Sequence, residues 1–151
     1  YYTGDGYSET GSNTMYSPYK RYYQTKEPTL KCAQTNDLFT LSTNEKGNKA
    51  LTYPIGLITV DELMLSGFAD GYINMNTYTY NTSTYWTMSP SYFNTADVAS
   101  NGFILDTRGY LNGYHWIWSG YGVRAVINLS SDTQISGGIG TVNNPFEVKI
   151  N

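Results

Sequence analysis

The sequence predicts an α+β fold in which two short helices in the first half precede a twisted, mostly antiparallel sheet with long loops. Three observations lead to this prediction. A capping-box pattern marks a helix start at Thr59, and beyond residue 68 the chain consists of short strand-like stretches separated by glycine turns. The length of 151 residues is enough for one domain with a hydrophobic core and too short for two ordinary domains.

The first 28 residues are expected to form an N-terminal arm and one short helix. Residues 1–16 show no hydrophobic period and are rich in Gly, Ser, Thr and Tyr, which indicates an irregular arm. Ser17 followed by Pro18 is typical of an N-cap with proline at the first helical position. This pattern predicts a helix over residues 18–24 that ends before Pro28. Short strands are expected next, at residues 38–42 and 51–53.

The second helix has the strongest local signal in the chain, at residues 59–62. Thr59 can accept a hydrogen bond from the Glu62 amide while the Glu62 carboxylate reaches back to the Thr59 amide. Gly67 provides the expected left-handed end of the helix. The helical period directs four side chains to the core, those of Val60, Leu63, Met64 and Phe68. Because the helix has only about two turns, tertiary packing must stabilise it.

The second half of the chain is expected to be mainly β. The expected strands lie at residues 78–80, 85–88, 103–106, 115–118, 123–129 and 146–150. The segment 123–129 is the most apolar of these, which predicts a position at the centre of the sheet. Trp86 is assigned to the core, and Arg124 to a paired or hydrogen-bonded position beside the central strand. The glycines of residues 137–140 indicate a tight turn, since no lysine or helix follows them as in a phosphate loop.

Composition argues against several classes of function. Charged residues make up only 14% of the chain, and 12 acidic against 9 basic residues leave a net charge of −3. The chain therefore lacks the basic surface that nucleic-acid binding requires. No apolar run approaches the roughly 18 residues that cross a bilayer, so no membrane span is expected. The chain opens on Tyr1 without a charged and apolar leader, and we expect it to be a mature or trimmed product.

The inventory of catalytic side chains is small. The only histidine, His115, lies among aromatic residues of an expected strand; it could act as a base, but a lone histidine there is more often structural. The only cysteine, Cys32, cannot form an internal disulfide, and with one histidine it cannot complete a zinc site. Asp61 and Glu62 are adjacent in the sequence and point apart. We therefore expect no enzyme, no catalytic residue, no cofactor and no metal centre.

One weaker metal site stays open at this point. Asp70 with Asn74 and Asn76 offers oxygen ligands of the kind that calcium prefers. Their spacing departs from the EF-hand pattern, and no second carboxylate accompanies them. The sequence alone neither predicts nor excludes a weak calcium site near Asp70.

Two stretches have the composition of binding loops. All but two of residues 71–85 are Gly, Tyr, Asn, Thr or Ser, and residues 110–121 combine large aromatic side chains with Asn, Ser and Gly. Tyr and Trp provide contact area at little cost in rotamer entropy. The predicted ligand-binding residues are Tyr72, Tyr78, Tyr80, Tyr110, Tyr114, Trp116, Trp118 and Tyr121. The alternative for Tyr78 and Tyr80 is that they only cover one face of a strand whose threonines lie on the other.

Four blocks of sequence resemble a family of uncharacterised bacterial surface domains. They read YPIGLITVDE at residues 53–62, YWTMSPSYF at 85–93, GVRAVINL at 122–129, and SGGIGT followed by NPF within 136–146. Domains of this family are frequent in Gram-positive bacteria and often follow a prepilin-type leader or another surface anchor. The resemblance covers residues 29–150. The chain departs from the family at Ala125, where proline is usual, and this loosens one turn or strand edge.

The family resembles the C-type-lectin and formylglycine-generating-enzyme structural class. The resemblance therefore implies a C-type-lectin-like domain over residues 29–151 and an extracellular or cell-surface location. It does not imply lectin activity, because the Glu-Pro-Asn and Trp-Asn-Asp calcium motifs are missing, and the cysteine pair of the copper-dependent enzymes is reduced to Cys32. Some members of this class diversify their loops through a retroelement, and the composition of residues 71–85 resembles such a region.

These observations favour a non-enzymatic binding or adhesion domain that presents its aromatic loops to a protein or glycan ligand at a bacterial surface. The alternative is a structural, pilin-like subunit of an extracellular filament, in which the same aromatic side chains would make contacts between subunits. Concentration-dependent self-association would favour that alternative. A third interpretation is an enzyme built around His115, which an unchanged activity of His115→Ala would exclude.

Overall fold

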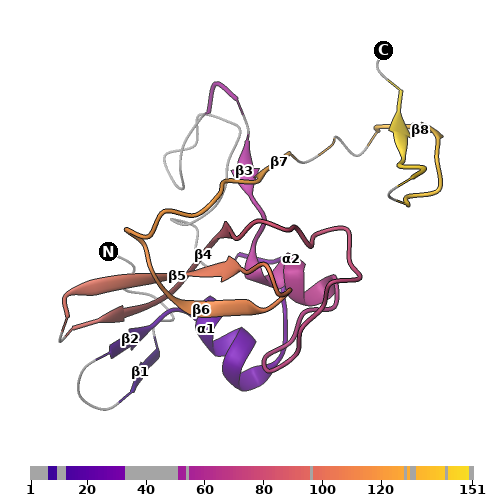
Figure 1. Cartoon of the computed structure of the whole chain (residues 1–151). Coiled ribbons are helices and arrows are strands. Elements are labelled where there is room, and N and C mark those ends of the chain that lie inside the picture. Colours follow the sequence, from indigo (N-terminus) through magenta and orange to yellow (C-terminus); the bar gives the residue numbers. More distant parts are fainter. Residues whose placement is uncertain are drawn as a thin grey trace.

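The computed structural model describes residues 7–9, 13–32, 51–53, 55–95, 97–127, 129, 132–141 and 143–149. In this part of the chain the fold is α+β: a five-stranded antiparallel sheet carries two short helical segments on one face, and two small two-stranded sheets lie beside it (Figure 1). The α+β class predicted from the sequence is confirmed. The strand expected at residues 38–42 lies outside the described residues.

The large sheet is built around a meander of three consecutive strands. Its order is β1 (Tyr7–Glu9), β2 (Asn13–Met15), β4 (Tyr85–Asn94), β5 (Ala99–Leu105) and β6 (Leu111–Trp116). The strands expected at 85–88 and 103–106 lie in β4 and β5. Along β4, buried residues alternate with more exposed ones, because only one face of the pleated strand contacts the helices.

The segment expected to be an irregular arm instead supplies β1 and β2. Residues 13–15 pair with the end of β4, and residues 7–9 pair with residues 13–15. The prediction is wrong for these residues because such short polar strands have no hydrophobic period of their own. Backbone pairing with the edge of β4 determines their conformation.

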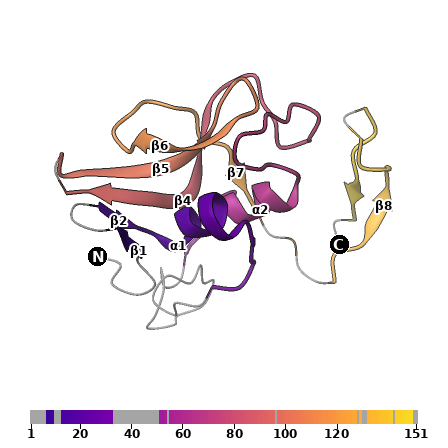
Figure 2. The same ribbon diagram turned by 90° about the horizontal axis from the view of Figure 1, so that it is seen from below.

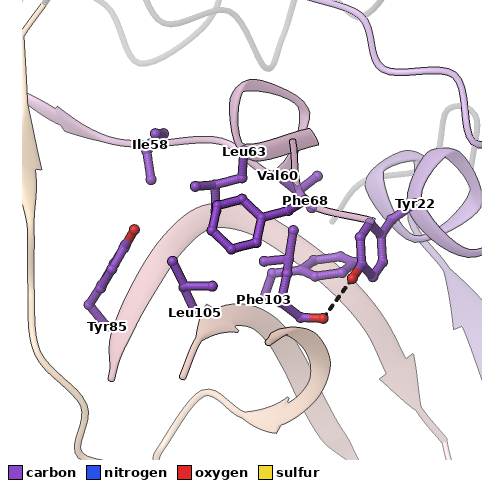
Figure 3. Close-up of a cluster of buried hydrophobic side chains, with 9 residues drawn as sticks. Tyr22, Ile58, Val60, Leu63, Phe68, Tyr85, Phe103 and Leu105 are labelled. Carbon is purple, nitrogen blue, oxygen red and sulfur yellow. Dashed lines mark hydrogen bonds between the residues drawn. The ribbon is translucent and has the colours of Figure 1, made fainter. Parts of the chain in front are cut away.

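The hydrophobic core lies between the large sheet and the helical segments (Figure 3). It consists of Tyr22, Ile58, Val60, Leu63, Phe68, Tyr85, Phe103, Leu105 and Leu111, none more than 8% exposed. Tyr22 is completely buried, and its hydroxyl donates a hydrogen bond of 2.8 Å to the Leu111 carbonyl. Burial raises the pKa of the Tyr22 phenol far above its ordinary value. The N-terminal segment therefore contributes to the same core as the meander.

The first helical segment confirms the helix predicted over residues 18–24. α1 (Ser17–Tyr19) continues as the π-helical segment η1 (Lys20–Thr25). Tyr16, and not Ser17, occupies the N-cap position, and proline lies in the first turn as expected. The helix ends where Lys26 adopts a left-handed conformation with φ 59°, two residues before the proline that was expected to end it.

The second helix, α2 (Val60–Leu65), has the predicted capping box. The Glu62 amide donates to Thr59 Oγ1 over 3.2 Å, and Glu62 Oε2 accepts from the Thr59 amide over 2.7 Å. The predicted core-facing side chains, Val60, Leu63, Met64 and Phe68, are buried or packed against the core. The Val60 amide also donates to Ser89 Oγ of β4 over 2.9 Å, which joins the start of the helix to the sheet.

The segment 123–129 is not the central strand that its apolar composition predicts. Only β7 (Ala125–Val126) is a strand, and it pairs with β3 (Gly56–Leu57) in a separate small sheet. Three of the apolar side chains are more than half exposed, those of Val123, Ile127 and Leu129. The prediction fails because the chain after β6 runs to the far end of β4, where Gly122 forms backbone hydrogen bonds with the residues on either side of Tyr85. The place beside the longest strand is already taken by β5.

Three further expected strands are absent or differently bounded. Residues 51–53 form a bend and residues 78–80 lie in a turn, while the strand expected at 115–118 is the end of β6, which stops at Trp116. Runs of two or three aromatic or apolar residues at alternate positions are too short to determine a strand. Turn hydrogen bonds decide the conformation at 78–80, as described below.

A small hairpin ends the described chain. β8 (Ile135–Gly137) pairs with β9 (Glu147–Val148), which is shorter than the strand expected at 146–150. Both views show this hairpin apart from the large sheet (Figures 1 and 2). The tight turn predicted from the glycines is displaced: the turn hydrogen bonds join Thr141 and Asn144, while Gly138 and Gly140 precede them with φ of 80° and 77°, a conformation that glycine adopts without strain.

Candidate functional site

The segment 69–84, here called the 69–84 loop, connects α2 to β4 without regular secondary structure. Its polar side chains bond within the protein. Asn74 Nδ2 donates to the Gly67 carbonyl over 3.1 Å, and Asn74 Oδ1 accepts from the Asn76 amide over 3.1 Å. Two further side chains of the loop accept hydrogen bonds from amides two residues ahead, those of Thr77 and Asn81. These local hydrogen bonds order the loop in place of the backbone hydrogen bonds of a helix or a sheet.

The tip of the loop is held from inside the protein at Thr79, which is 2% exposed. The Thr79 carbonyl accepts from the Tyr85 hydroxyl over 2.5 Å and from Arg124 Nη1 over 2.6 Å. Arg124 Nη2 donates to the Tyr78 carbonyl over 3.0 Å, and the guanidinium lies over the Tyr85 ring. Burial raises the pKa of Tyr85, and the nearby Arg124 offsets this only in part. Arg124 is thus hydrogen-bonded as predicted, but to a loop and not beside a central strand.

Four large side chains of the 69–84 loop are exposed to solvent. Tyr72 is 72% exposed, Ile73 64%, Met75 54% and Tyr78 74%. We call these four residues the loop surface. The strand on which Tyr78 and Tyr80 would cover one face is absent, because residues 78 and 79 lie in a turn; the turn still buries Thr79 and exposes Tyr78.

The turn after β5 packs against the loop. Asp106 Oδ1 accepts from the amides of Arg108 (2.9 Å) and Tyr110 (3.0 Å), and Oδ2 accepts from the Arg108 guanidinium at 2.7 and 2.9 Å. Burial acts to raise the pKa of the Asp106 carboxyl, but these hydrogen bonds outweigh it and hold the pKa below its ordinary value. Gly109 has φ 74°, and a Cβ there would lie 2.7 Å from the Asn74 carbonyl oxygen, so the close approach requires glycine.

A hollow of about 270 Å³ lies where this turn meets the loop, lined by Ile73, Arg108 and Tyr110. Ile73 and Tyr110 form a β-bridge across it. The Tyr80 hydroxyl donates to the Thr107 carbonyl over 2.9 Å, so Tyr80 joins the loop to the same turn. Four predicted binding residues, Tyr72, Tyr78, Tyr80 and Tyr110, therefore belong to one region near the start of β6.

Trp116 and Trp118 lie at the other end of β6. Their ring centroids are 4.9 Å apart with 36° between the planes, and they are 47% and 61% exposed. The Ser119 amide donates to the Trp116 carbonyl over 2.9 Å, which closes a tight turn; we call residues 116–119 the tryptophan corner. A strand of the length of β6 spans about 20 Å, so the corner and the loop surface are separate.

Tyr121 and His115 flank this corner in the sequence and contact each other. His115 Nδ1 lies 2.9 Å from the Tyr121 hydroxyl, and the Tyr121 ring packs 5.3 Å from that of Trp86 between centroids. Trp86, which was assigned to the core, is only partly buried. Desolvation lowers the pKa of His115, and the Asp106 carboxylate offsets this only in part, so the imidazole is neutral at pH 7. His115 in this position stabilises the segment that follows β6.

Tyr114 belongs to a tyrosine cluster that sequence reasoning missed. Its hydroxyl lies 2.8 Å from that of Tyr19, and its ring packs against Tyr23 and Tyr92 at 5.3 and 5.6 Å between centroids. Tyr114 is 53% exposed, yet it joins α1 and η1 to β6. The available signal was the spacing of Tyr19, Tyr22 and Tyr23, which is that of one helix face.

Two of the three side chains considered for calcium, those of Asp70 and Asn74, are engaged in other contacts. Asp70 Oδ2 lies 3.0 Å from Lys26 Nζ, and the Asn74 side chain bonds within the loop. Across the described residues, no three His, Cys, Asp or Glu side chains are grouped so as to hold a metal. Cys32 is exposed. In the same part of the chain, no helix is long and apolar enough to span a membrane.

Comparison with known proteins gave no match: no family model matches the chain, and neither the curated proteins nor the solved structures searched include a significant match. The geometry of the loop surface and the tryptophan corner is therefore the basis for a functional assignment.

Proposed function

We propose that this chain is a non-enzymatic extracellular binding or adhesion domain that presents tyrosine-rich loops to a protein or glycan ligand at a bacterial surface. The observation that carries the proposal is the loop surface, where Tyr72, Ile73, Met75 and Tyr78 are 54–74% exposed on an ordered loop. Large apolar side chains concentrated on one exposed segment are typical of interaction sites, since a partner that covers them removes apolar area from water.

The ordering of the loop supports the same function. Arg124 and Tyr85 hold the Thr79 carbonyl, and Asn74 bonds to Gly67 and to Gly109, so the exposed side chains are positioned before any ligand arrives. Binding then costs less conformational entropy than it would on a mobile segment.

The charged side chains near the loop surface are paired with one another, which favours a ligand whose contact surface is uncharged. Arg108 lies 2.7 Å from the Asp106 carboxylate, and Lys26 lies 3.0 Å from that of Asp70. A charged ligand would have to compete with these pairs, whereas an apolar or hydroxylated face would contact the tyrosines and leave the pairs intact.

The sequence blocks quoted above favour a C-type-lectin-like scaffold for this domain. An antiparallel sheet with a long ordered loop between α2 and β4 is consistent with that proposal. Diversification of the loop by a retroelement would require adenine-rich codons over residues 71–85 and a nearby template copy. Sequencing the gene and its neighbourhood checks both requirements.

Binding assays with matched variants test the proposed function. The labelled full chain would be applied to a glycan microarray and to immobilised extracellular-matrix proteins. We expect saturable binding to at least one ligand and a loss of about tenfold in affinity for the double variant Tyr72→Ser/Tyr78→Ser. Tyr53→Ser is the control, because Tyr53 is 75% exposed and lies outside both surfaces. Equal binding by all three proteins would reject the loop surface as the site.

A pilin-like filament subunit is the second candidate function, and the β8–β9 hairpin favours it. None of the described residues in 132–149 is buried, and the exposed apolar side chains there are Ile135, Ile139, Phe146 and Val148. A two-stranded hairpin has little stability alone, so contact between subunits would stabilise it. Sedimentation at rising protein concentration tests this candidate: assembly that Phe146→Ser prevents would favour it, and a monomer throughout would exclude it.

A further inference from the structure

We propose that the tryptophan corner binds a neutral sugar ring of a glycan. The inference rests on the proposed binding function and adds to it a ligand class and a second surface. The corner presents two indoles on the turn that follows β6, Trp116 and Trp118. His115, within β6, and Tyr121, just before Gly122, flank the corner in the sequence and contact each other.

The two indoles have the geometry of an open stacking site. Their planes make an angle of 36° and their centroids are 4.9 Å apart, so the two rings are in tilted contact. Trp116 remains 47% exposed and Trp118 61% exposed in this arrangement. The face of an indole carries negative charge density and packs against the C–H face of a pyranose, and both surfaces then leave water.

The backbone fixes the corner before a ligand binds. The Ile117 amide donates to the Ser100 carbonyl of β5 over 3.1 Å, and the Ser119 amide donates to the Trp116 carbonyl over 2.9 Å. The indoles are thus carried by a turn that is hydrogen-bonded to the start of β5. A sugar that stacks there meets a preformed surface, which reduces the entropy cost of binding.

The charge of the corner selects neutral sugars over acidic ones. Residues 111–123 contain no Asp, Glu, Lys or Arg. The nearest basic residue in the sequence, Arg124, donates to the carbonyls of Thr79 and Tyr78 in the 69–84 loop. A carboxylated sugar would find no cation within residues 111–123, while sugar hydroxyl groups can bond to a neutral donor and acceptor such as the Ser119 hydroxyl.

The size of the corner also favours a sugar over a protein. A stable protein interface covers about 800 Å² on each partner. Two half-exposed indoles offer on the order of 200 Å² of ring surface, which is enough for one or two sugar rings.

Titration with soluble neutral oligosaccharides tests the inference. Chitotetraose, cellotetraose and maltotetraose would be added to the full chain at up to about 10 mM, with indole N–H signals followed by NMR. The chain has three tryptophans, so each signal can be assigned by substitution. We expect at least one sugar to shift the Trp116 and Trp118 signals more than that of Trp86. Trp118→Ala should weaken this binding about tenfold, and Trp118→Phe should lose less because a ring remains.

Two variants separate this inference from the proposed function. Tyr53→Ala should bind the sugar like the unmodified chain, since Tyr53 lies outside the corner. If Tyr78→Ala weakens sugar binding and Trp118→Ala does not, the sugar binds at the loop surface; the corner is then excluded while the proposed function stands. Absence of any indole shift with all three sugars would also overturn the inference. The inference would also be overturned if Trp118→Ala left sugar binding unchanged and instead abolished self-association of the chain or its binding to phosphatidylglycerol vesicles.

Discussion

Arg21 and Asp61 show how one ion pair connects distant parts of this molecule. Asp61 is 4% exposed, and Arg21 binds both of its carboxylate oxygens at 2.6 and 2.7 Å. The Thr29 amide donates to the same carboxylate over 3.0 Å. The pair therefore holds η1 and the following segment against the start of α2. The buried Asp61 carboxylate is tolerated there because the Arg21 guanidinium compensates its charge.

Removal of the arginine should destabilise the protein. Arg21→Ala leaves the buried Asp61 carboxylate without its cation, and we expect a loss of about 2 kcal/mol in the free energy of unfolding, since Arg21 itself is partly exposed. Arg21→Lys should recover only part of this, because an ammonium cannot bind a carboxylate in the bidentate way. Urea denaturation measures both variants. A change below about 0.5 kcal/mol in Arg21→Ala would contradict the role assigned to the pair.

His115 makes the stability of the protein depend on pH. Desolvation lowers its pKa in the folded state, so folding favours the neutral imidazole. This contribution is present above the unfolded pKa of about 6.5 and is lost as the pH falls toward the lower folded value. We expect the melting temperature to fall between about pH 7.5 and about pH 5.5, and to fall less in His115→Gln. An NMR titration midpoint at or above about 6.5 would contradict the assignment.

At the scale of elements, α2 depends on its cap and on its packing. The capping box is local, since Thr59 and Glu62 are three residues apart, and it was predicted from the sequence. The second support is the hydrogen bond from the Val60 amide to Ser89. It joins residues 29 positions apart and was not predicted from the sequence. A helix of six residues needs both kinds of contact.

Loss of the cap should have a moderate effect. Thr59→Ala removes the acceptor for the Glu62 amide, and we expect the free energy of unfolding to fall by about 1 kcal/mol. Thermal or urea denaturation measures the change. Thr52→Ala, an exposed threonine on the nearby bend, should stay within about 0.5 kcal/mol of the unmodified protein. Equal effects of the two substitutions would show that the cap has no special role.

Arg124 makes one of the long-range contacts that hold the 69–84 loop, and it acts at the loop tip. Arg124→Ala removes two hydrogen bonds to the loop tip, those to the Thr79 and Tyr78 carbonyls. We expect chymotrypsin to cleave after Tyr78 several-fold faster, because the tip then opens without global unfolding. Lys31→Ala, an exposed cation outside the loop, should leave the rate unchanged. Unchanged cleavage in Arg124→Ala would show that Tyr85 and the local threonine bonds suffice.

At the scale of the whole molecule, the core and the C-terminal hairpin make unequal contributions to stability. The core unites residues of η1, α2, β4, β5 and β6, among them Phe103 with no exposed surface. The hairpin lies apart from it in both views (Figures 1 and 2). Phe146 packs locally over Gly140.

Two phenylalanine substitutions should reveal this difference. Phe103→Ala removes a ring from the centre of the core and should cost about 3–5 kcal/mol. Phe146→Ala should change the free energy of unfolding of a dilute sample by at most about 0.5 kcal/mol, because Phe146 is 58% exposed. Urea denaturation by tryptophan fluorescence compares them. A large effect of Phe146→Ala in dilute solution would show that the hairpin packs on the core.

Part of the candidate site could be predicted from the sequence. The sequence placed binding residues in 71–85 and 110–121, and Tyr72, Tyr78, Trp116 and Trp118 are exposed there. It did not predict that β6 separates them into two surfaces. It also could not distinguish them from Tyr114, whose partners Tyr19 and Tyr92 lie far away in the sequence.

The sequence by itself determined what depends on composition and on neighbours a few residues apart: the α+β class, the cap of α2 and the low content of charged residues. The tertiary structure alone decided the position of residues 123–129, the outward direction of Tyr78 and the partner of Arg124. The physical reason is that strand pairing and side-chain hydrogen bonds across 40 or more residues, as between Arg124 and Thr79, are chosen by competition among distant segments. A local hydrophobic period carries no information about that competition.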